Sequence, residues 1–192
     1  FKLRFLYGFN APIHEALGYG KTLHDALSEI HKRALEGDMV TKDSAATLID
    51  RHLNVPFAYS ALREQLRNAG VKAIERYFDT HGADITNTEF SEKRIQVHIA
   101  PGITVDGRID LIRRLDTGEV AIVDFKSTER AQAEDVTRDQ LHVYAVGYQE
   151  LTGKSADLIE VLNLDEKGRT TREPVDTPLL TAVREKIRDA GE

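Results

Sequence analysis

Alternating apolar and polar residues predict a β-strand near residues 85–99. Ile95, Val97 and Ile99 are separated by polar residues, which is the pattern of a strand with one buried face. Two further runs, rich in β-branched and aliphatic residues, occupy most of residues 105–126. The four residues between them, Asp-Thr-Gly-Glu, have the composition of a hairpin loop. The middle of the chain is therefore expected to form three consecutive strands, the last two antiparallel.

Helical periodicity is found on both sides of these strands. Apolar residues recur at intervals of three and four from residue 21 until Gly37, which predicts a helix and its stop. Residues 40–81 are expected to be mostly helical, with Asp43 and Ser44 as a cap and Gly70 as a mild interruption. The remaining predictions are core packing of residues 1–9, a helix ending at Gly153, a strand over 156–164 and a C-terminal helix over 178–190.

Length and composition indicate a soluble globular protein. The chain has 192 residues, enough for one domain with a sizeable core, and 41% of them are hydrophobic and 30% charged. The net charge of −6 argues against binding nucleic acid through overall positive charge. Any such binding must be local, through metal ions and a few arginines and lysines. The absence of cysteine excludes disulfides and thiolate metal sites.

The two ends and the apolar runs of the chain bear on its cellular context. No apolar run is long enough to span a membrane, and no signal segment opens the sequence. We therefore expect a cytoplasmic location with no membrane partner. The chain begins at Phe1 rather than at a methionine, so we also expect it to be a fragment of a longer protein.

Three charged residues interrupt the apolar runs of the expected hairpin. Asp110 lies in the first run, and Asp124 and Lys126 flank Phe125 in the second. Residues two apart on a strand share a face, at a distance of about 6.6 Å along it. A carboxylate inside an apolar strand is costly unless it is paired, hydrogen-bonded or bound to a metal. The spacing alone leaves two interpretations: a structural salt bridge or solvated edge strand, and a divalent-cation site.

The same residues resemble the motif of a known family. Asp110 within the tetrapeptide GRID, followed by the tripeptide DFK at 124–126, is similar to the pattern of PD-(D/E)XK nucleases in their RecB-like exonuclease branch. That branch also has a helical histidine before the motif and a Gln-x-x-x-Tyr sequence after it. His24 stands in the first place, and Gln140 and Tyr144 stand in the second. The proline of the family's name is replaced here by an isoleucine, as is common in this branch.

The resemblance implies an α/β fold with a restriction-endonuclease-like core, in which a mixed central sheet is flanked by helices. We expect one nuclease domain over residues 1–192, with a helical insert at 36–84 and a sheet-bearing catalytic core at 85–164. Similar domains are fused to DNA helicases and act in DNA repair and recombination. The expected partners are therefore a helicase, in the same polypeptide or complex, and DNA, either single-stranded or at duplex ends.

The resemblance also implies a chemistry, which is metal-dependent hydrolysis of DNA phosphodiesters by an exonuclease. The implied ligands of Mg²⁺ or Mn²⁺ are His24, Asp110, Asp124 and the backbone carbonyl of Phe125. Asp110, Asp124 and Lys126 are the implied catalytic residues. Lys126 would orient the attacking water or stabilise the transition state, because it places a fixed positive charge where negative charge grows.

Other residues have weaker assignments. Gln140 and Tyr144, four residues apart on one helix face, would position the substrate. Glu92 stands where relatives often have an auxiliary acid, although its loose spacing favours a surface glutamate. A lone histidine such as His24 is usually a core residue, and only the resemblance makes it a ligand. His31 lies about 10.5 Å further along the helix, so both cannot bind one ion. The iron–sulfur cluster of some relatives is excluded because cysteine is absent.

Two other classes of function stay open at this point. The domain could be a catalytically inert copy that binds or channels DNA, although the intact acids and lysine argue against that. It could also be a structural module docked on a helicase, which its acidic charge would suit. Metal-dependent cleavage of DNA by the isolated domain separates the nuclease from both alternatives.

Overall fold

The computed structural model of this chain describes residues 15–100, 102–127, 134–164, 168–176, 178–182 and 185. The expected core segment at residues 1–9 lies outside these ranges, as do parts of the loop after the hairpin, of the turn near residue 166 and of the C-terminal helix. Residues 178–182, at the start of that predicted helix, are helical.

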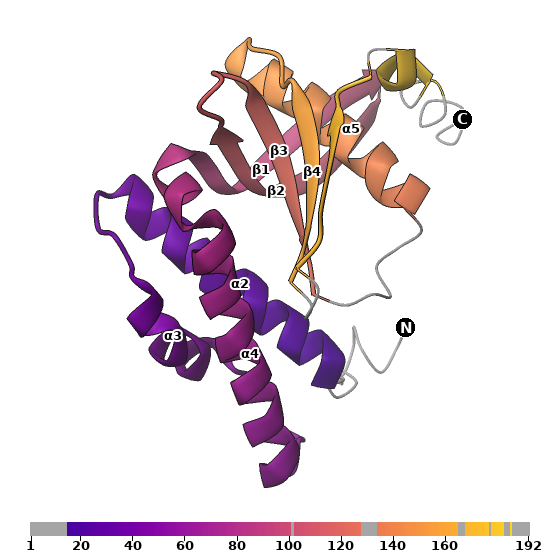
Figure 1. The fold of residues 1–192 in the computed structure, drawn as a ribbon. Helices are drawn as coiled ribbons and strands as arrows, with labels where there is room; N and C mark the ends of the chain where they lie inside the picture. The colour runs from indigo at the N-terminus through magenta and orange to yellow at the C-terminus, as the bar shows by residue number, and fades with distance from the viewer. Residues whose placement is uncertain are drawn as a thin grey trace, which may run out of the picture.

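Five strands form one mixed sheet in the order β1-β2-β3-β4-β5 (Figure 1). Neighbouring strands are antiparallel except β3 and β4, which are parallel and are joined through a helix that crosses one face of the sheet. The three strands expected before the crossover and the one after it are present; the edge strand β5 was not predicted. The strands are β1 Thr88–Ala100, β2 Ile103–Arg114, β3 Val120–Lys126, β4 Leu158–Asn163 and β5 Thr170–Pro174.

Helices cover both faces of the sheet (Figure 1). Helices α2 and α4 pack on one face, α3 packs against these two helices, and α5 packs on the other face. Short 3₁₀ turns precede α3 and follow α4. The apolar stripes of the helices form two separate cores, one on each side of the sheet. This is the predicted mixed sheet flanked by helices, as in a restriction-endonuclease-like core. The helices are α2 Glu15–Leu35, α3 Ala45–His52, α4 Ser60–His81 and α5 Glu134–Thr152.

Turn glycines end the elements where the sequence predicts. Gly118 in the hairpin loop has φ of 90°, and its N–H donates to the carbonyl of Leu115 at 2.8 Å. Gly37 and Gly153 follow α2 and α5 with φ of 81° and 71°, values that favour glycine at a helix C-terminus.

Three local predictions were wrong. Helix α2 begins at Glu15, ahead of the expected start. Ser44 forms no capping hydrogen bond because it belongs to a 3₁₀ turn and has helical dihedral angles. Gly70 does not interrupt α4; a side chain there would meet the side chain of Ile49 on α3, with the nearest atom 3.1 Å away. Gly70 is thus a close-packing position between two helices. None of the described helices is long and apolar enough to cross a membrane.

The β1–β2 hairpin changes the face that it presents to the helices at one point. Leu111 belongs to the core under α2 and α4, whereas Ile109, two residues earlier on β2, belongs to the core under α5. Regular alternation would place both on one face. Opposite this step on β1 lies Glu92, whose φ of 53° is in the left-handed region. Asp110 therefore stands where the hairpin twists from one layer to the other.

Candidate metal centre

Three possible metal ligands from different elements converge at this twist. His24 comes from α2, Glu92 from β1 and Asp110 from β2, and one ligand atom from each lies within 4.8 Å of the others. Nδ1 of His24 lies 3.5 Å from Oδ2 of Asp110. Helix α2 can approach this closely because Gly20 faces Ser127 at the end of β3, where a Cβ would lie 2.6 Å from the serine hydroxyl.

Asp110 joins two strands that have begun to separate. The last ladder pair between β2 and β3 is Leu111 with Val123. Beyond it, the N–H of Phe125 donates to Oδ2 of Asp110 at 2.9 Å, so a side chain replaces the main-chain acceptor. A strand residue directs its N–H and C=O to the same side. The Phe125 carbonyl is therefore on the Asp110 side of β3, the position that the predicted ligand role requires.

Asp124 and Lys126 share a face of β3, as their spacing predicts. Nζ of Lys126 lies 2.8 Å from Oδ2 of Asp124. This contact is an ion pair, and the buried Oδ2 has no hydrogen-bond partner among the other described residues. Burial raises the pKa of the Asp124 carboxyl above its ordinary value, although the adjacent ammonium opposes the shift. The predicted salt bridge thus exists, but it leaves one carboxylate oxygen incompletely satisfied.

The electrostatics of the site favour a bound cation. Burial alone would lower the pKa of His24, but the carboxylates of Asp110, Asp124 and Glu92 outweigh it and raise this pKa above its ordinary value. Carboxylate oxygens with an imidazole nitrogen are suitable donors for Mg²⁺ or Mn²⁺. The buried, unsatisfied oxygen of Asp124 beside them adds a further candidate donor. The residues therefore fit a divalent metal ion.

Comparison with known proteins identifies the family of the chain. The family model described as PD-(D/E)XK nuclease superfamily matches residues 1–192. The chain belongs to this superfamily. No curated protein matches the nuclease domain significantly. Among solved structures, it is similar to a candidate exonuclease from Eubacterium rectale, with 10% identity, coverage of 84% of this chain and 76% of the other, and a TM-score of 0.43. It is also similar to the protein SSO0001, with 15% identity, coverage of 98% and 82%, and a TM-score of 0.37.

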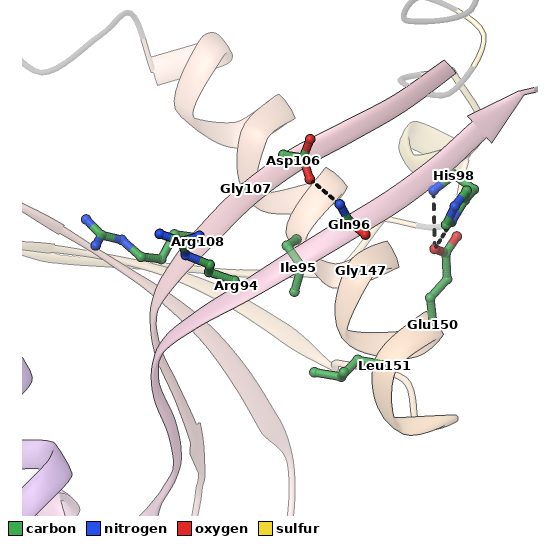
Figure 2. A pocket seen from close by; sticks show the side chains of 10 residues that line it. All are labelled: Arg94, Ile95, Gln96, His98, Asp106, Gly107, Arg108, Gly147, Glu150 and Leu151. Carbon is green, nitrogen blue, oxygen red and sulfur yellow. Dashed lines mark hydrogen bonds and ion pairs between the residues drawn. The ribbon is translucent and has the colours of Figure 1, made fainter. Parts of the chain in front are cut away.

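Glu92 belongs to the candidate metal centre, although the sequence also fitted a surface position. Its side chain is only 13% exposed, which does not fit an ordinary surface glutamate. One oxygen lies 2.8 Å from Nε of Arg108 on β2, a residue that lines a groove beside the site (Figure 2). The left-handed backbone at Glu92 costs about 1 kcal/mol or more, and no sequence period signals such a conformation.

Gln140 and Tyr144 face one another on α5, as their spacing predicts. Nε2 of Gln140 donates to the Tyr144 hydroxyl at 2.6 Å. The Tyr144 ring is 9% exposed and packs on Gly107 of β2, where a Cβ would lie 2.6 Å from a ring carbon. Tyr144 therefore supports the strand segment that leads to Asp110. The substrate-positioning role of the pair stays a prediction.

His31 is a buried polar residue whose position the sequence did not predict. Its Nδ1 lies 2.6 Å from the Thr88 hydroxyl and its Nε2 lies 2.7 Å from the Tyr77 hydroxyl. Its ring stacks on Phe125, with centroids 6.4 Å apart and planes at 25°. Burial lowers the pKa of His31 to about 3, so the imidazole is neutral. His31 thus supports Phe125 from the core, and helical spacing from His24 was its only sequence signal.

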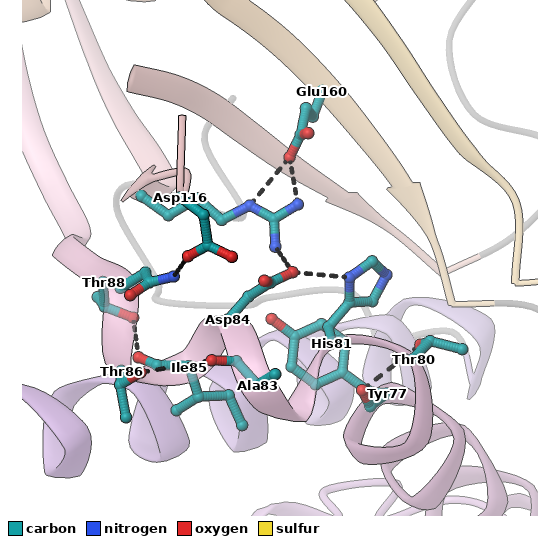
Figure 3. Close-up of polar contacts among 12 residues, drawn as sticks. Tyr77, Thr80, His81, Ala83, Asp84, Ile85, Thr86, Thr88, Asp116 and Glu160 are labelled. Carbon is teal, nitrogen blue, oxygen red and sulfur yellow. Dashed lines mark hydrogen bonds and ion pairs between the residues drawn. The ribbon is translucent and has the colours of Figure 1, made fainter. Parts of the chain in front are cut away.

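A second charged cluster lies on the same sheet (Figure 3). Arg113 is 1% exposed and donates to Oε2 of Glu160 through Nε and Nη2, at 3.1 and 2.7 Å, and to Asp84 through Nη1 at 2.6 Å. Arg172 pairs with the other oxygen of Glu160. The arginines and carboxylates of this cluster are extensively hydrogen-bonded within the protein, which is the arrangement of a structural ion-pair network.

Proposed function

We propose that this domain hydrolyses phosphodiester bonds in DNA with a divalent metal ion. The observation that carries the proposal is the convergence of His24, Glu92 and Asp110 within 4.8 Å. This group lies beside an aspartate–lysine pair in a chain of the nuclease superfamily. Acids that converge in this way repel one another unless a cation is present.

The proposed metal ligands are His24, Asp110, Asp124 and the carbonyl of Phe125, with Glu92 as a further candidate. Bound Mg²⁺ or Mn²⁺ supplies an acidified water molecule and neutralises charge on the scissile phosphate. His24 would have to be neutral to ligate the ion, so any proton on its imidazole would be lost when a metal binds. Asp110 is held in place by its hydrogen bond from Phe125, which limits the reorganisation needed at the site.

Lys126 supplies the positive charge for the transition state. It is an ammonium beside Asp124, directed to the same face of β3. An ammonium cannot ligate a metal, but it can orient the attacking water or stabilise the negative charge that grows on the phosphate. Gln140 and Tyr144 are proposed to position the substrate, since they follow the sequence pattern of the RecB-like branch.

The direct test is incubation of the 192-residue chain with end-labelled single-stranded and duplex DNA, with Mg²⁺, with Mn²⁺ and with chelator. We expect shortening of the DNA from an end, only when a divalent ion is present. Activity that persists in excess chelator contradicts the metal mechanism. DNA binding without cleavage under all conditions supports the inert DNA-binding module instead.

The biological setting proposed for the domain is DNA repair or recombination together with a DNA helicase. Its support is the likeness of the GRID, DFK and Gln-x-x-x-Tyr sequences to helicase-fused nucleases. The net charge of −6 also suits a domain that receives DNA from a partner rather than capturing it alone. ATP-dependent degradation of duplex DNA by the natural protein or its complex is the expected result. Equal rates with and without ATP contradict the helicase association.

A further inference from the structure

A groove of about 830 Å³ runs along the β1–β2 hairpin and α5, next to the candidate metal centre (Figure 2). Arg94 and Arg108 lie together at one end of it, while His98 and Glu150 lie at the other. The groove is adjacent to the metal-ligand cluster rather than part of it, because Glu92 belongs to that cluster and contacts Arg108.

The two arginines form an unbalanced pair of like charges. Arg94 and Arg108 are direct cross-strand partners in the β1–β2 ladder. Like charges in this relation destabilise a hairpin unless anions offset them. Arg108 has such a partner in Glu92, at 2.8 Å. Arg94 is exposed and forms no ion pair with any residue that the structure describes. Excess positive charge therefore remains at the end of the groove nearest to the metal centre.

The acids of the groove do not neutralise this end. Asp106 accepts a hydrogen bond from Nε2 of Gln96 at 2.8 Å, further along the hairpin. Glu150 accepts from the backbone N–H of His98 at 3.3 Å and lies 3.8 Å from its Nδ1. Figure 2 shows both acids directed to these partners and away from the arginines. The groove is therefore positively charged at the end nearest to the candidate metal centre. The polar side chains along the rest of the groove are paired with one another.

We propose that Arg94 and Arg108 bind the backbone phosphates next to the phosphate that is hydrolysed, so that the groove holds one strand of nucleic acid. This inference rests on the proposed nuclease function. Guanidinium groups bind phosphate oxygens through two parallel hydrogen bonds. Arg94 is two residues from Glu92 on β1, about 7 Å along the strand, so a phosphate that it binds lies close to the metal ligands. In a chain of net charge −6, such local cations have to supply the attraction.

Binding measurements without metal test the groove separately from catalysis. The 192-residue chain is titrated in chelator against a fluorescein-labelled single-stranded oligonucleotide, and anisotropy gives Kd over a range of KCl concentrations. We expect Arg94→Ala to raise Kd by about tenfold. The slope of log K against log salt should fall in magnitude by about 0.7. With Mg²⁺ present, KM for DNA should rise while kcat at saturating DNA is unchanged.

Arg63→Ala is the matched control. It removes the same charge from an exposed position in the first turn of α4, and it should leave both Kd and the salt slope unchanged. If Arg94→Ala changes binding no more than Arg63→Ala does, the groove proposal is overturned, even when the wild type cleaves DNA. A wild type that never cleaves, but binds DNA through Arg94, contradicts the proposed function and supports only the part of the groove proposal that concerns nucleic-acid binding. A loss of kcat with unchanged Kd also overturns the groove proposal.

Discussion

Two buried carboxylates on neighbouring strands of this sheet have opposite environments. Glu160 of β4 is fully buried, and both of its oxygens have arginine partners. Asp124 of β3 is 7% exposed, and its Oδ2 has a lysine nearby without a hydrogen bond. Glu160 lies beside Val123, one residue before Asp124, so the two carboxylates point to opposite faces of the sheet.

This difference distinguishes a structural ion pair from a site that can bind a ligand. Both acids have a counter-charge within 3 Å, so proximity of charge does not distinguish them. Completeness of hydrogen bonding does, because a buried oxygen without a donor carries a desolvation cost that a ligand can relieve. The Glu160 network needs nothing more, whereas the proposed cation would complete the Asp110 and Asp124 region.

The largest expected loss of stability comes from breaking the ion-pair network of Arg113, Glu160 and Asp84. Arg113→Met leaves Glu160 with one arginine and removes a partner of Asp84, so we expect the free energy of unfolding to fall by about 3–5 kcal/mol. Denaturant titration measures this. The control is Arg114→Met, the next residue on β2, whose side chain is 45% exposed. The free energy of unfolding should fall by no more than about 1 kcal/mol in this variant. Equal losses of stability in the two variants would show that the buried Arg113 network contributes no more than the exposed Arg114 ion pair.

At the candidate metal centre, we expect a substitution to reduce activity without a comparable loss of stability. Lys126→Ala should reduce the cleavage rate by about 100- to 1,000-fold, since it removes one preorganised positive charge. Mg²⁺ binding should be nearly unchanged because an ammonium is not a ligand. Lys42→Ala, which removes an exposed lysine paired with Asp79, is the control and should cleave at the wild-type rate. A Lys126 variant within a few-fold of wild type excludes this residue from the mechanism.

The buried His31 behind the site predicts a pH dependence of stability. Its pKa is about 3 in the folded protein and about 6.5 when unfolded. Between these values the unfolded chain binds a proton that the folded protein does not. Stability should therefore be complete above about pH 6.5 and should fall on acidification by up to about 1.4 kcal/mol per pH unit from this group.

His31→Gln isolates this contribution, because glutamine can hydrogen-bond without titrating. Unfolding of both proteins is measured from neutral pH down to acid. The variant should be less stable at neutral pH, and its stability should fall less steeply with acidification. Parallel pH profiles would show that folding does not lower the pKa of His31.

The smallest effect distinguishes a metal site from a salt bridge at Asp110. If Mg²⁺ binds with a Kd of roughly 1 mM, ~10 mM Mg²⁺ adds about 1.4 kcal/mol of stability by linkage. Tm should then rise by roughly 3–6 °C. Asp110→Asn should largely lose this rise and should be as stable as the wild type, or more so, in chelator. Lys126 stays paired in this variant because its partner is Asp124.

Thermal melts of wild type and Asp110→Asn, each with Mg²⁺ and with chelator, distinguish a metal site from a salt bridge at Asp110. A variant that is destabilised equally in both buffers would show that Asp110 has a purely structural role. Arg113→Met supplies the contrast, since its melting temperature should still rise with Mg²⁺ by the wild-type amount.

Much of the central hairpin was predictable because its signals are local. The alternation at Ile95 and Val97 matches their burial, and the Asp-Thr-Gly-Glu loop forms the predicted turn at Gly118. The shared face of Asp124 and Lys126, and that of Gln140 and Tyr144, also follow from the periods of strand and helix. Strand β5 was missed because its residues, Thr170–Pro174, are mostly exposed and carry no apolar alternation.

The sequence by itself determined which residues could form a site: the acids and lysine of the hairpin, with His24 on the preceding helix. Only the tertiary structure decided that Glu92 joins them, that Arg108 pairs with it, and that Arg113 and Glu160 form a separate closed network. The physical reason is the distance along the sequence between the residues that interact. Periodicity gives the direction of a side chain relative to its own element, whereas Arg113 and Glu160 are 47 residues apart. The left-handed residue Glu92 also breaks the alternation on which such a prediction depends.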